Sequence, residues 1–160
     1  MSKTRVLILA GGQSDEHPVS LTSARSVLDS LQETALDATA VVIGRDGRWL
    51  TTSQSAQVLS EQTGAEGGVE VLAGAKIAND FDVVFPILHG PNGEDGTVQG
   101  MLELAGIPYV GSGVLASALC MDKAMSKDVL AHHGFSQVPF HLVHRHTLPS
   151  ETDRIVEEIA

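Results

Sequence analysis

Two short apolar segments, each followed by a glycine-containing polar loop and then by a helical pattern, most constrain how this chain can fold. The first runs from Arg5 to Ala10 and the second from Phe81 to Leu88. Both are apolar at consecutive positions, which is typical of strands buried on two faces of a parallel sheet. The alternation of strands with helical segments predicts an α/β fold: an open, mainly parallel sheet with helices on both faces.

Apolar periodicity and turn residues predict the other elements. We expect helices over residues 15–32, 55–61, 97–105 and 122–133, one helical turn over 116–119, and strands over 38–43 and 69–73. Ser14 or Asp15 is expected to cap the first long helix. The Asp46-Gly47 turn predicts a hairpin that returns through Trp49. A last helical pattern follows Ser150 and has no stop signal, so we expect a longer natural protein.

Charge and composition exclude several classes of function. With 10 basic and 20 acidic residues the net charge is −10, which argues against binding nucleic acid or an anionic membrane. Apolar runs stay far below the roughly 20 residues of a membrane helix. The amino terminus lacks the pattern of a signal peptide, and one cysteine, Cys120, permits no internal disulfide. We therefore expect a cytoplasmic protein with Cys120 as a small buried hydrophobe.

The expected topology brings two loops together. Right-handed crossovers place the loops that follow parallel strands at the same carboxyl edge of the sheet, where α/β proteins bind ligands. The loop from Gly11 to Glu16 and the loop from His89 to Gly96 should therefore be neighbours. In the first loop, Asp15 and Glu16 either complement the helix dipole or hold a substrate ammonium. The loop lacks the G-x-G-x-x-G pattern, which disfavours a dinucleotide site.

The second loop combines four glycines with His89, Glu94 and Asp95. These three side chains could bind a metal, but their spacing matches no strong metal signature, and the two carboxylates could equally cap the next helix. Both interpretations stay open from the residues alone. The abundance of glycine favours a loop that accommodates a ligand.

Basic and imidazole side chains cluster in the last third of the chain. Lys123 and Lys127 share one helix face, either solvated or in contact with a phosphate. His144 and His146 should share one face of an extended segment. No cysteine or carboxylate joins the late histidines at a ligand spacing, so we expect solvent-facing rings at residues His132, His133, His141, His144 and His146.

Three motifs resemble D-alanine–D-alanine ligases. They are His89-Gly90-x-x-Gly93-Glu94-Asp95-Gly96-x-Val98-Gln99-Gly100, the opening motif over residues 11–20, and the Tyr109-x-Gly111-Ser112-Gly113 motif that continues to Lys123. The resemblance covers about residues 5–140 in the family's order. Residues 44–78 resemble the longer variant of the family, and Pro18 departs from its pattern.

The resemblance implies an ATP-dependent enzyme that joins two D-alanines into D-alanyl-D-alanine for peptidoglycan, through an acylphosphate and with Mg²⁺. It further implies an amino-terminal α/β substrate domain over residues 1–125 and the start of the ATP-grasp central domain over 126–160. Homodimers are implied as well. On this basis the chain alone should be inactive, and the metal ligands and adenine pocket should lie beyond residue 160.

Site roles follow from the same resemblance, position by position. Glu16 resembles the glutamate that binds the ammonium of the first D-alanine, Val19 the apolar contact of its methyl group, and His89 the histidine near its carboxylate. Glu16 and His89 are thereby the catalytic candidates, and Lys123 resembles a lysine that contacts ATP phosphate. Glu94 and Asp95 are expected to organise their loop, and no metal site is assigned. D-lactate or D-serine as the second substrate, or a non-catalytic α/β ligand-binding module, remain alternatives.

Overall fold

The computed structural model describes residues 3–61, 80–144, 146, 152 and 154–157. The chain forms two compact units, Met1–Met121 and Asp122–Ala160. The expected domain division at residue 125 stays a prediction about the whole protein. The predicted strand over 69–73 and the predicted cap Ser150 lie outside the described residues. None of the helices in the described part is long and apolar enough to cross a membrane.

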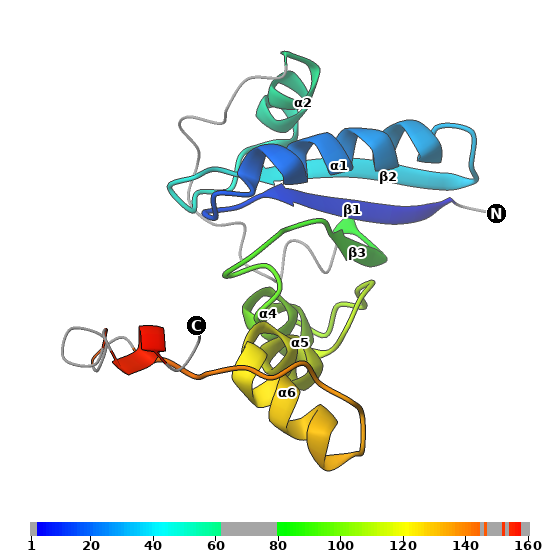
Figure 1. The fold of residues 1–160 in the computed structure, drawn as a ribbon. Helices are drawn as coiled ribbons and strands as arrows, with labels where there is room; N and C mark the ends of the chain where they lie inside the picture. The colour runs from blue at the N-terminus through cyan, green and yellow to red at the C-terminus, as the bar shows by residue number, and fades with distance from the viewer. Residues whose placement is uncertain (1–2, 62–79, 145, 147–151, 153, 158–160) are drawn as a thin grey trace. The chain divides into compact units, whose positions relative to one another are not determined.

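The first unit is built on a parallel sheet of three described strands in the order β2-β1-β3 (Figure 1). These are β1 (Thr4–Gly11), β2 (Leu36–Ile43) and β3 (Val83–Pro86). Val6 of the central strand pairs with Ala38 on one side and with Val83 on the other. The short β3 replaces the expected strand over 81–88, although the Ile87 N–H still donates to the Leu9 carbonyl at 2.7 Å.

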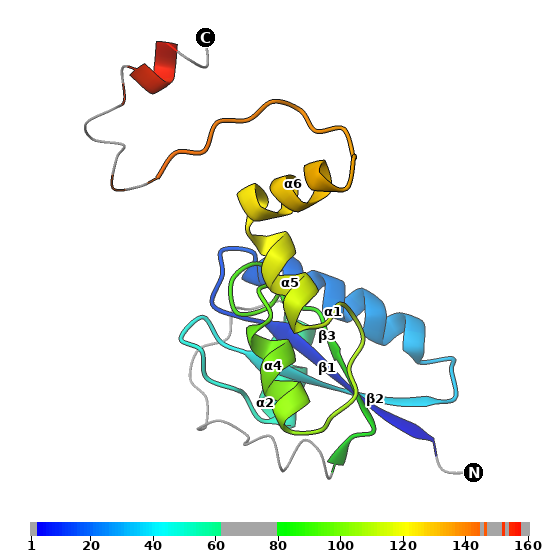
Figure 2. The ribbon, with the colours of Figure 1, turned by 90° about the horizontal axis from the view of Figure 1, so that it is seen from below.

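Helices cover both faces of this sheet, as predicted. On one face α1 (His17–Leu31) packs on Val6, Ile8 and Ala10 of β1, and α2 (Thr52–Glu61) packs on β2. On the other face α4 (Thr97–Leu104) packs on Leu7 and Leu9 (Figure 1 and Figure 2). Because side chains alternate along a strand, β1 supplies both cores, and it is apolar at every position from Val6 to Ala10.

Two local predictions hold, one helix is longer than predicted, and one burial prediction is wrong. The predicted hairpin forms, since Ile43 and Trp49 make an antiparallel bridge. The segment over 116–119 is part of a longer helix, α5 (Val114–Met121). Cys120 is exposed, because α5 buries Ser117 instead. In the second unit, α6 (Lys123–His132) begins after Asp122, as expected.

A buried hydroxyl joins α1 to the ends of two strands. Ser20 is fully buried, and its Oγ accepts a hydrogen bond from the Gly11 N–H at 2.7 Å. The same hydroxyl donates to the Ile87 carbonyl. Gly11 ends β1 and Ile87 follows β3, so a single side chain fixes both strand ends against the helix.

Removing this hydroxyl should destabilise the first unit. Ser20→Ala leaves a buried N–H and a buried carbonyl without their partner, and we expect a loss of about 1–3 kcal/mol in the free energy of unfolding. Urea unfolding can be followed by the fluorescence of Trp49, the single tryptophan, which is buried in the same unit. Ser26→Ala is the matched control, because the exposed Ser26 hydroxyl donates to the Thr22 carbonyl of its own helix, the one bond that it makes among the described residues. Equal losses in the two variants would contradict the expectation.

Candidate functional site

The two glycine-containing loops are neighbours, as the topology predicts. The Ser14 hydroxyl donates to the His89 carbonyl at 2.7 Å. The Asn92 amide donates to Gln13 Oε1 at 3.2 Å. Two side-chain hydrogen bonds therefore join segments separated by more than seventy positions, at the carboxyl edge of the sheet.

Glu16 lies against the second loop at Gly90. A Cβ on Gly90 would come within 3.1 Å of Glu16 Oε2, and the backbone there has a φ of +70°. Glycine is the residue that adopts this conformation without strain and leaves this space open. Glu16 is therefore close to the His89 loop because Gly90 has no side chain.

The first helix starts later than predicted, and this leaves Glu16 available. Glu16, rather than Ser14 or Asp15, is the N-cap residue of α1, and its side chain makes no capping hydrogen bond. Ser14 Oγ instead accepts from the Glu16 N–H at 3.2 Å while donating to the other loop. The carboxylate of Glu16 is exposed and is not occupied by the helix backbone.

The start of α1 also decides where Val19 points. A helix that begins at His17 turns residues 17, 20, 21 and 24 toward the sheet, at the i, i+3, i+4 and i+7 positions. Val19 lies off this face and is 55% exposed. Val19 is one turn from Glu16 on the outer side of α1.

The first loop is tightly held at its start. A Cβ on Gly11 would meet the Ile43 carbonyl at 2.3 Å and His17 Cε1 at 2.9 Å, and Gly11 has a φ of +86°. The next residue, Gly12, donates its N–H to the Ile43 carbonyl at 2.8 Å. Its carbonyl lies 2.7 Å from His17 Nδ1. The turn out of β1 is thus packed against both β2 and α1.

Glu94 and Asp95 organise the second loop, as expected. Glu94 Oε2 accepts from the Gly90 N–H at 2.7 Å. The two Asp95 oxygens accept from the N–H groups of Asn92 at 2.9 Å and Thr97 at 3.0 Å. Burial alone would raise the pKa of Asp95, but the hydrogen bonds from Asn92 and Thr97 outweigh it and hold that pKa below its ordinary value.

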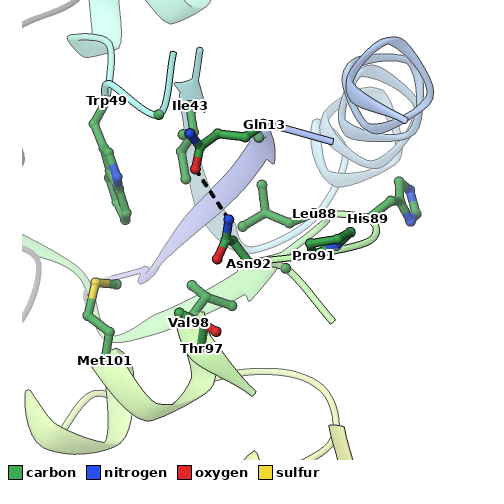
Figure 3. Close-up of a pocket in the computed structure, with 13 residues that line it drawn as sticks. Gln13, Ile43, Trp49, Leu88, His89, Pro91, Asn92, Thr97, Val98 and Met101 are labelled. Carbon is green, nitrogen blue, oxygen red and sulfur yellow. Dashed lines mark hydrogen bonds between the residues drawn. The ribbon is translucent and has the colours of Figure 1, made fainter. Parts of the chain in front are cut away.

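His89 is half-buried, and its Nε2 has no hydrogen-bond partner within the described part of the chain. Its ring points away from Trp49 and Met101 (Figure 3). Its backbone carbonyl is the group that accepts from Ser14. The structure thus brings the His89 loop and Glu16 to one edge of the sheet, as predicted.

A cavity of about 190 Å³ lies between the two loops and the hairpin after β2 (Figure 3). The bonded pair Gln13 and Asn92 lines it, and its apolar side chains are Ile43, Trp49, Leu88, Pro91, Val98 and Met101. Neither Glu16 nor Val19 lines this cavity. Sequence reasoning did not find the cavity, because its walls come from four separate segments.

In the second unit, the two candidate lysines have different surroundings. Asp122 caps α6, and its Oδ1 accepts from the N–H groups of Ala124 and Met125 at 3.0 Å each. Lys123 is the first residue of this helix, while Lys127 Nζ lies 5.1 Å from the centre of the Phe140 ring. That cation–π contact gives Lys127 a local packing partner.

The histidines of the second unit form ring contacts. The rings of His144 and His146 are stacked with their centres 5.4 Å apart, as expected for side chains on one face of an extended segment. His132 and His133 meet edge to face at the same distance. Across the described residues, no three His, Cys, Asp or Glu side chains come together as metal ligands.

Three polar residues have structural roles that the sequence did not predict: His17 and Ser20 were given no role, and Ser14 was expected only as a helix cap. All three belong to the motif over residues 11–20. The available signal was the helical spacing of His17 and Ser20, which places polar side chains on the face that α1 buries. Such residues have to find hydrogen-bond partners, and here the partners are the ends of the strands and the loop.

Comparison with known proteins gives consistent matches over the chain. Residues 5–112 match the family model described as D-ala D-ala ligase N-terminus. A D-alanine–D-alanine ligase from Deinococcus radiodurans is 51% identical over 153 residues, which are 96% of this chain and 45% of that protein.

Solved structures of such ligases have the same fold. D-alanyl-alanine synthetase A from Vibrio cholerae superposes with a TM-score of 0.78 at 33% identity, over 99% of this chain and 46% of that one. The VanG D-Ala:D-Ser ligase from Enterococcus faecalis gives 0.73 at 32% identity, over 99% and 50%. The chain therefore spans about half the length of the relatives it matches.

Protonating Asp95 should loosen the second loop. Because its pKa is lowered in the folded protein, its stabilising effect is present above about pH 4 and is lost as the pH falls through the lowered value. At pH 7 we expect Asp95→Asn to reduce the free energy of unfolding by about 1–2 kcal/mol, and we expect this difference to shrink at pH 3. Urea unfolding at both pH values measures it, with Glu33→Gln, an exposed carboxylate after α1, as the control. A difference that is the same at pH 3 and pH 7 would refute the role of the charged form.

Proposed function

Because this chain belongs to the D-alanine–D-alanine ligase N-terminal domain family, we propose that it holds the first D-alanine in an ATP-dependent ligase. The observation that carries the proposal is the position of the Glu16 carboxylate. It lies against the His89 loop at the carboxyl edge of a parallel sheet, and the helix backbone does not use it. A free amino acid needs such an anion for its ammonium group.

The side chains around Glu16 suit the remaining groups of D-alanine. In the proposed arrangement Glu16 binds the ammonium, the His89 imidazole faces the carboxylate, and Val19 contacts the methyl group. The exposure of Val19 on the outer side of α1, one turn from Glu16, supports this role. The absence of a side chain at Gly90 leaves room beside the Glu16 carboxylate.

The proposed reaction joins two D-alanines. The carboxylate of the first attacks the γ-phosphorus of ATP, which releases ADP and leaves an acylphosphate. The amine of the second D-alanine then attacks the acyl carbon, the carbon–oxygen bond to phosphate breaks, and the amine loses a proton. The residues of this chain contribute by binding and orienting the first substrate, which places its carboxylate for the transfer.

The proposed contact with ATP is Lys123. The amide groups of Ala124 and Met125 at the start of α6 are taken by Asp122, so a phosphate would meet the Lys123 ammonium rather than the helix backbone. Bound Mg²⁺ would neutralise phosphate charge during the transfer. The described residues offer no group of three metal ligands, so we assign no step of this chain to the metal.

The setting proposed for the whole protein is the cytoplasm, as a homodimer that supplies D-alanyl-D-alanine for peptidoglycan. D-serine as the second substrate is the alternative with a specific observation behind it. One of the matching structures is a D-Ala:D-Ser ligase, and it fits this chain nearly as well as the others do. Both versions use the same first substrate, so the proposed roles of Glu16, Val19 and His89 are unchanged.

The 160-residue chain alone should not form dipeptide. It matches about half of each relative, and we propose that the remaining half carries most of the ATP site. Incubation of the purified chain with ATP, Mg²⁺ and D-alanine should yield neither dipeptide nor phosphate, measured by chromatography and phosphate release. Turnover by this chain would overturn the proposed division.

The two charged site residues should affect different substrates. In a ligase that carries this chain followed by the remaining domains, Glu16→Gln should raise the KM for the first D-alanine by about tenfold or more and leave the KM for ATP nearly unchanged. Lys123→Ala should do the reverse. Steady-state kinetics fitted with separate constants for the two D-alanines would measure both effects.

Two matched substitutions serve as controls for these variants. Lys127→Ala removes a lysine on the same helix whose ammonium lies over Phe140, and Glu33→Gln removes an exposed carboxylate after α1. We expect neither control substitution to change the KM for one substrate more than the KM for the other. If Glu16→Gln and Lys123→Ala changed both constants equally, the assigned roles would be wrong.

A further inference from the structure

We propose that His17 is a positioning residue for the first D-alanine: its Nδ1–H holds the Gly12 carbonyl and thereby fixes where the Glu16 carboxylate lies. The inference rests on the proposed function of Glu16 as the ammonium ligand. His17 directly follows Glu16 and is the first residue of α1.

The imidazole of His17 is committed to one hydrogen bond. The residue is 1% exposed, and its Nδ1 lies 2.7 Å from the Gly12 carbonyl oxygen. Because a carbonyl oxygen only accepts, Nδ1 has to carry the proton. Nε2 has no partner in the part of the chain that the structure describes, so the bond to Gly12 is the polar contact that the buried ring makes there.

This bond completes a clamp on the Gly12 residue. Its N–H donates to the Ile43 carbonyl at 2.8 Å, and its carbonyl accepts from His17. The ring is also close to Gly11, where a Cβ would stand 2.9 Å from His17 Cε1. The first residues of the loop are therefore fixed to β2 on one side and to α1 on the other.

The clamp closes the short loop that carries Glu16, the proposed binding group for the ammonium. Gln13, Ser14, Asp15 and Glu16 lie between Gly12 and His17. Within this loop Ser14 is bonded to the His89 carbonyl and also accepts from the Glu16 N–H. Glu16 thus lies between two anchored neighbours, Ser14 and His17. Misplacement of a substrate-binding group by about 1 Å can cost a large factor in rate.

His17 acts through Glu16 rather than on the substrate. Its ring is enclosed beneath the Gly11 turn, where the described residues leave almost none of it exposed. Glu16, by contrast, is exposed at the loop surface. Loss of the His17 bond should therefore appear in the binding of the amino acid that Glu16 holds and not in the binding of ATP.

Three substitutions separate the hydrogen bond from the bulk of the ring. In His17→Asn the side-chain NH₂ is the same number of bonds from Cα as Nδ1, so it can still donate to Gly12. In His17→Gln the NH₂ is one bond further away, and the donor is misplaced. His17→Leu fills a similar volume without a donor.

The kinetic test uses a ligase that carries this chain followed by the remaining domains. We expect His17→Leu and His17→Gln to raise the KM for the first D-alanine about tenfold, with the KM for ATP within about twofold of the unsubstituted enzyme. His17→Asn should stay within about threefold for both constants. If the Leu variant does not fold, the Asn and Gln pair decides, because both are polar.

A merely structural role gives a different pattern and would overturn the proposal. In that case all three variants would lose thermal stability and total activity together, without a split between the two KM values and without rescue by Asn. The proposal would also be overturned by an equal rise in both KM values, or by an unchanged KM for D-alanine in the His17→Gln and His17→Leu variants.

A second measurement is independent of activity. Nitrogen-15 NMR of the imidazole groups of the 160-residue chain should show His17 as the Nδ1–H tautomer, and the Nε2–H tautomer would overturn the proposal. Failure of the complete, unsubstituted enzyme to join D-alanines would instead refute the proposed function. The two failures are therefore distinguishable.

Discussion

The buried hydroxyl of Ser20 is the interaction on which the arrangement of this domain depends. It receives the N–H of Gly11 and donates to the carbonyl of Ile87, so the last residue of β1, the residue after β3 and the first turns of α1 are held at one point. Parallel strands leave backbone groups without sheet partners where they end, and burial makes those groups costly unless a side chain pairs with them. The two loops that leave these strand ends start from fixed positions for this reason.

From these fixed starts, the loops come into contact through hydrogen bonds and through glycines, which leave room because they have no side chain. Ser14 reaches the His89 carbonyl, and Gln13 meets Asn92. Gly90 leaves the space in which Glu16 lies, and Gly11 leaves the space for the Ile43 carbonyl and the His17 ring. The acidic residues of the second loop are used inside it, since Glu94 and Asp95 accept from its own backbone. Of the two exposed carboxylates of the first loop, Glu16 lies against Gly90 of the second loop, whereas Asp15 lies 3.9 Å from Arg45.

Much of the fold could be predicted because its signals are local. The strand over residues 5–10, the hairpin at Trp49 and the Asp122 cap all follow from patterns within a few residues, and the structure contains them. The errors concern features that depend on which face of a helix is buried, or on residues that are far apart in the sequence. Cys120 was expected to be buried because of its residue type, but α5 buries Ser117 and leaves Cys120 exposed. The apolar cavity beside Trp49 was not predicted, because residues from four segments form it.

The sequence by itself determined the class of fold, the order of the strands and helices, and the family, since apolar period and motif spacing are properties of the chain. It also determined that the two loops share an edge of the sheet, because crossovers between parallel strands have one hand. Only the tertiary structure decided which side chain of the first loop is available for a ligand. The positions of the Glu16 carboxylate, the Ser14 hydroxyl and the His17 ring depend on hydrogen bonds to backbone groups of other segments, and no local pattern encodes where those groups will lie.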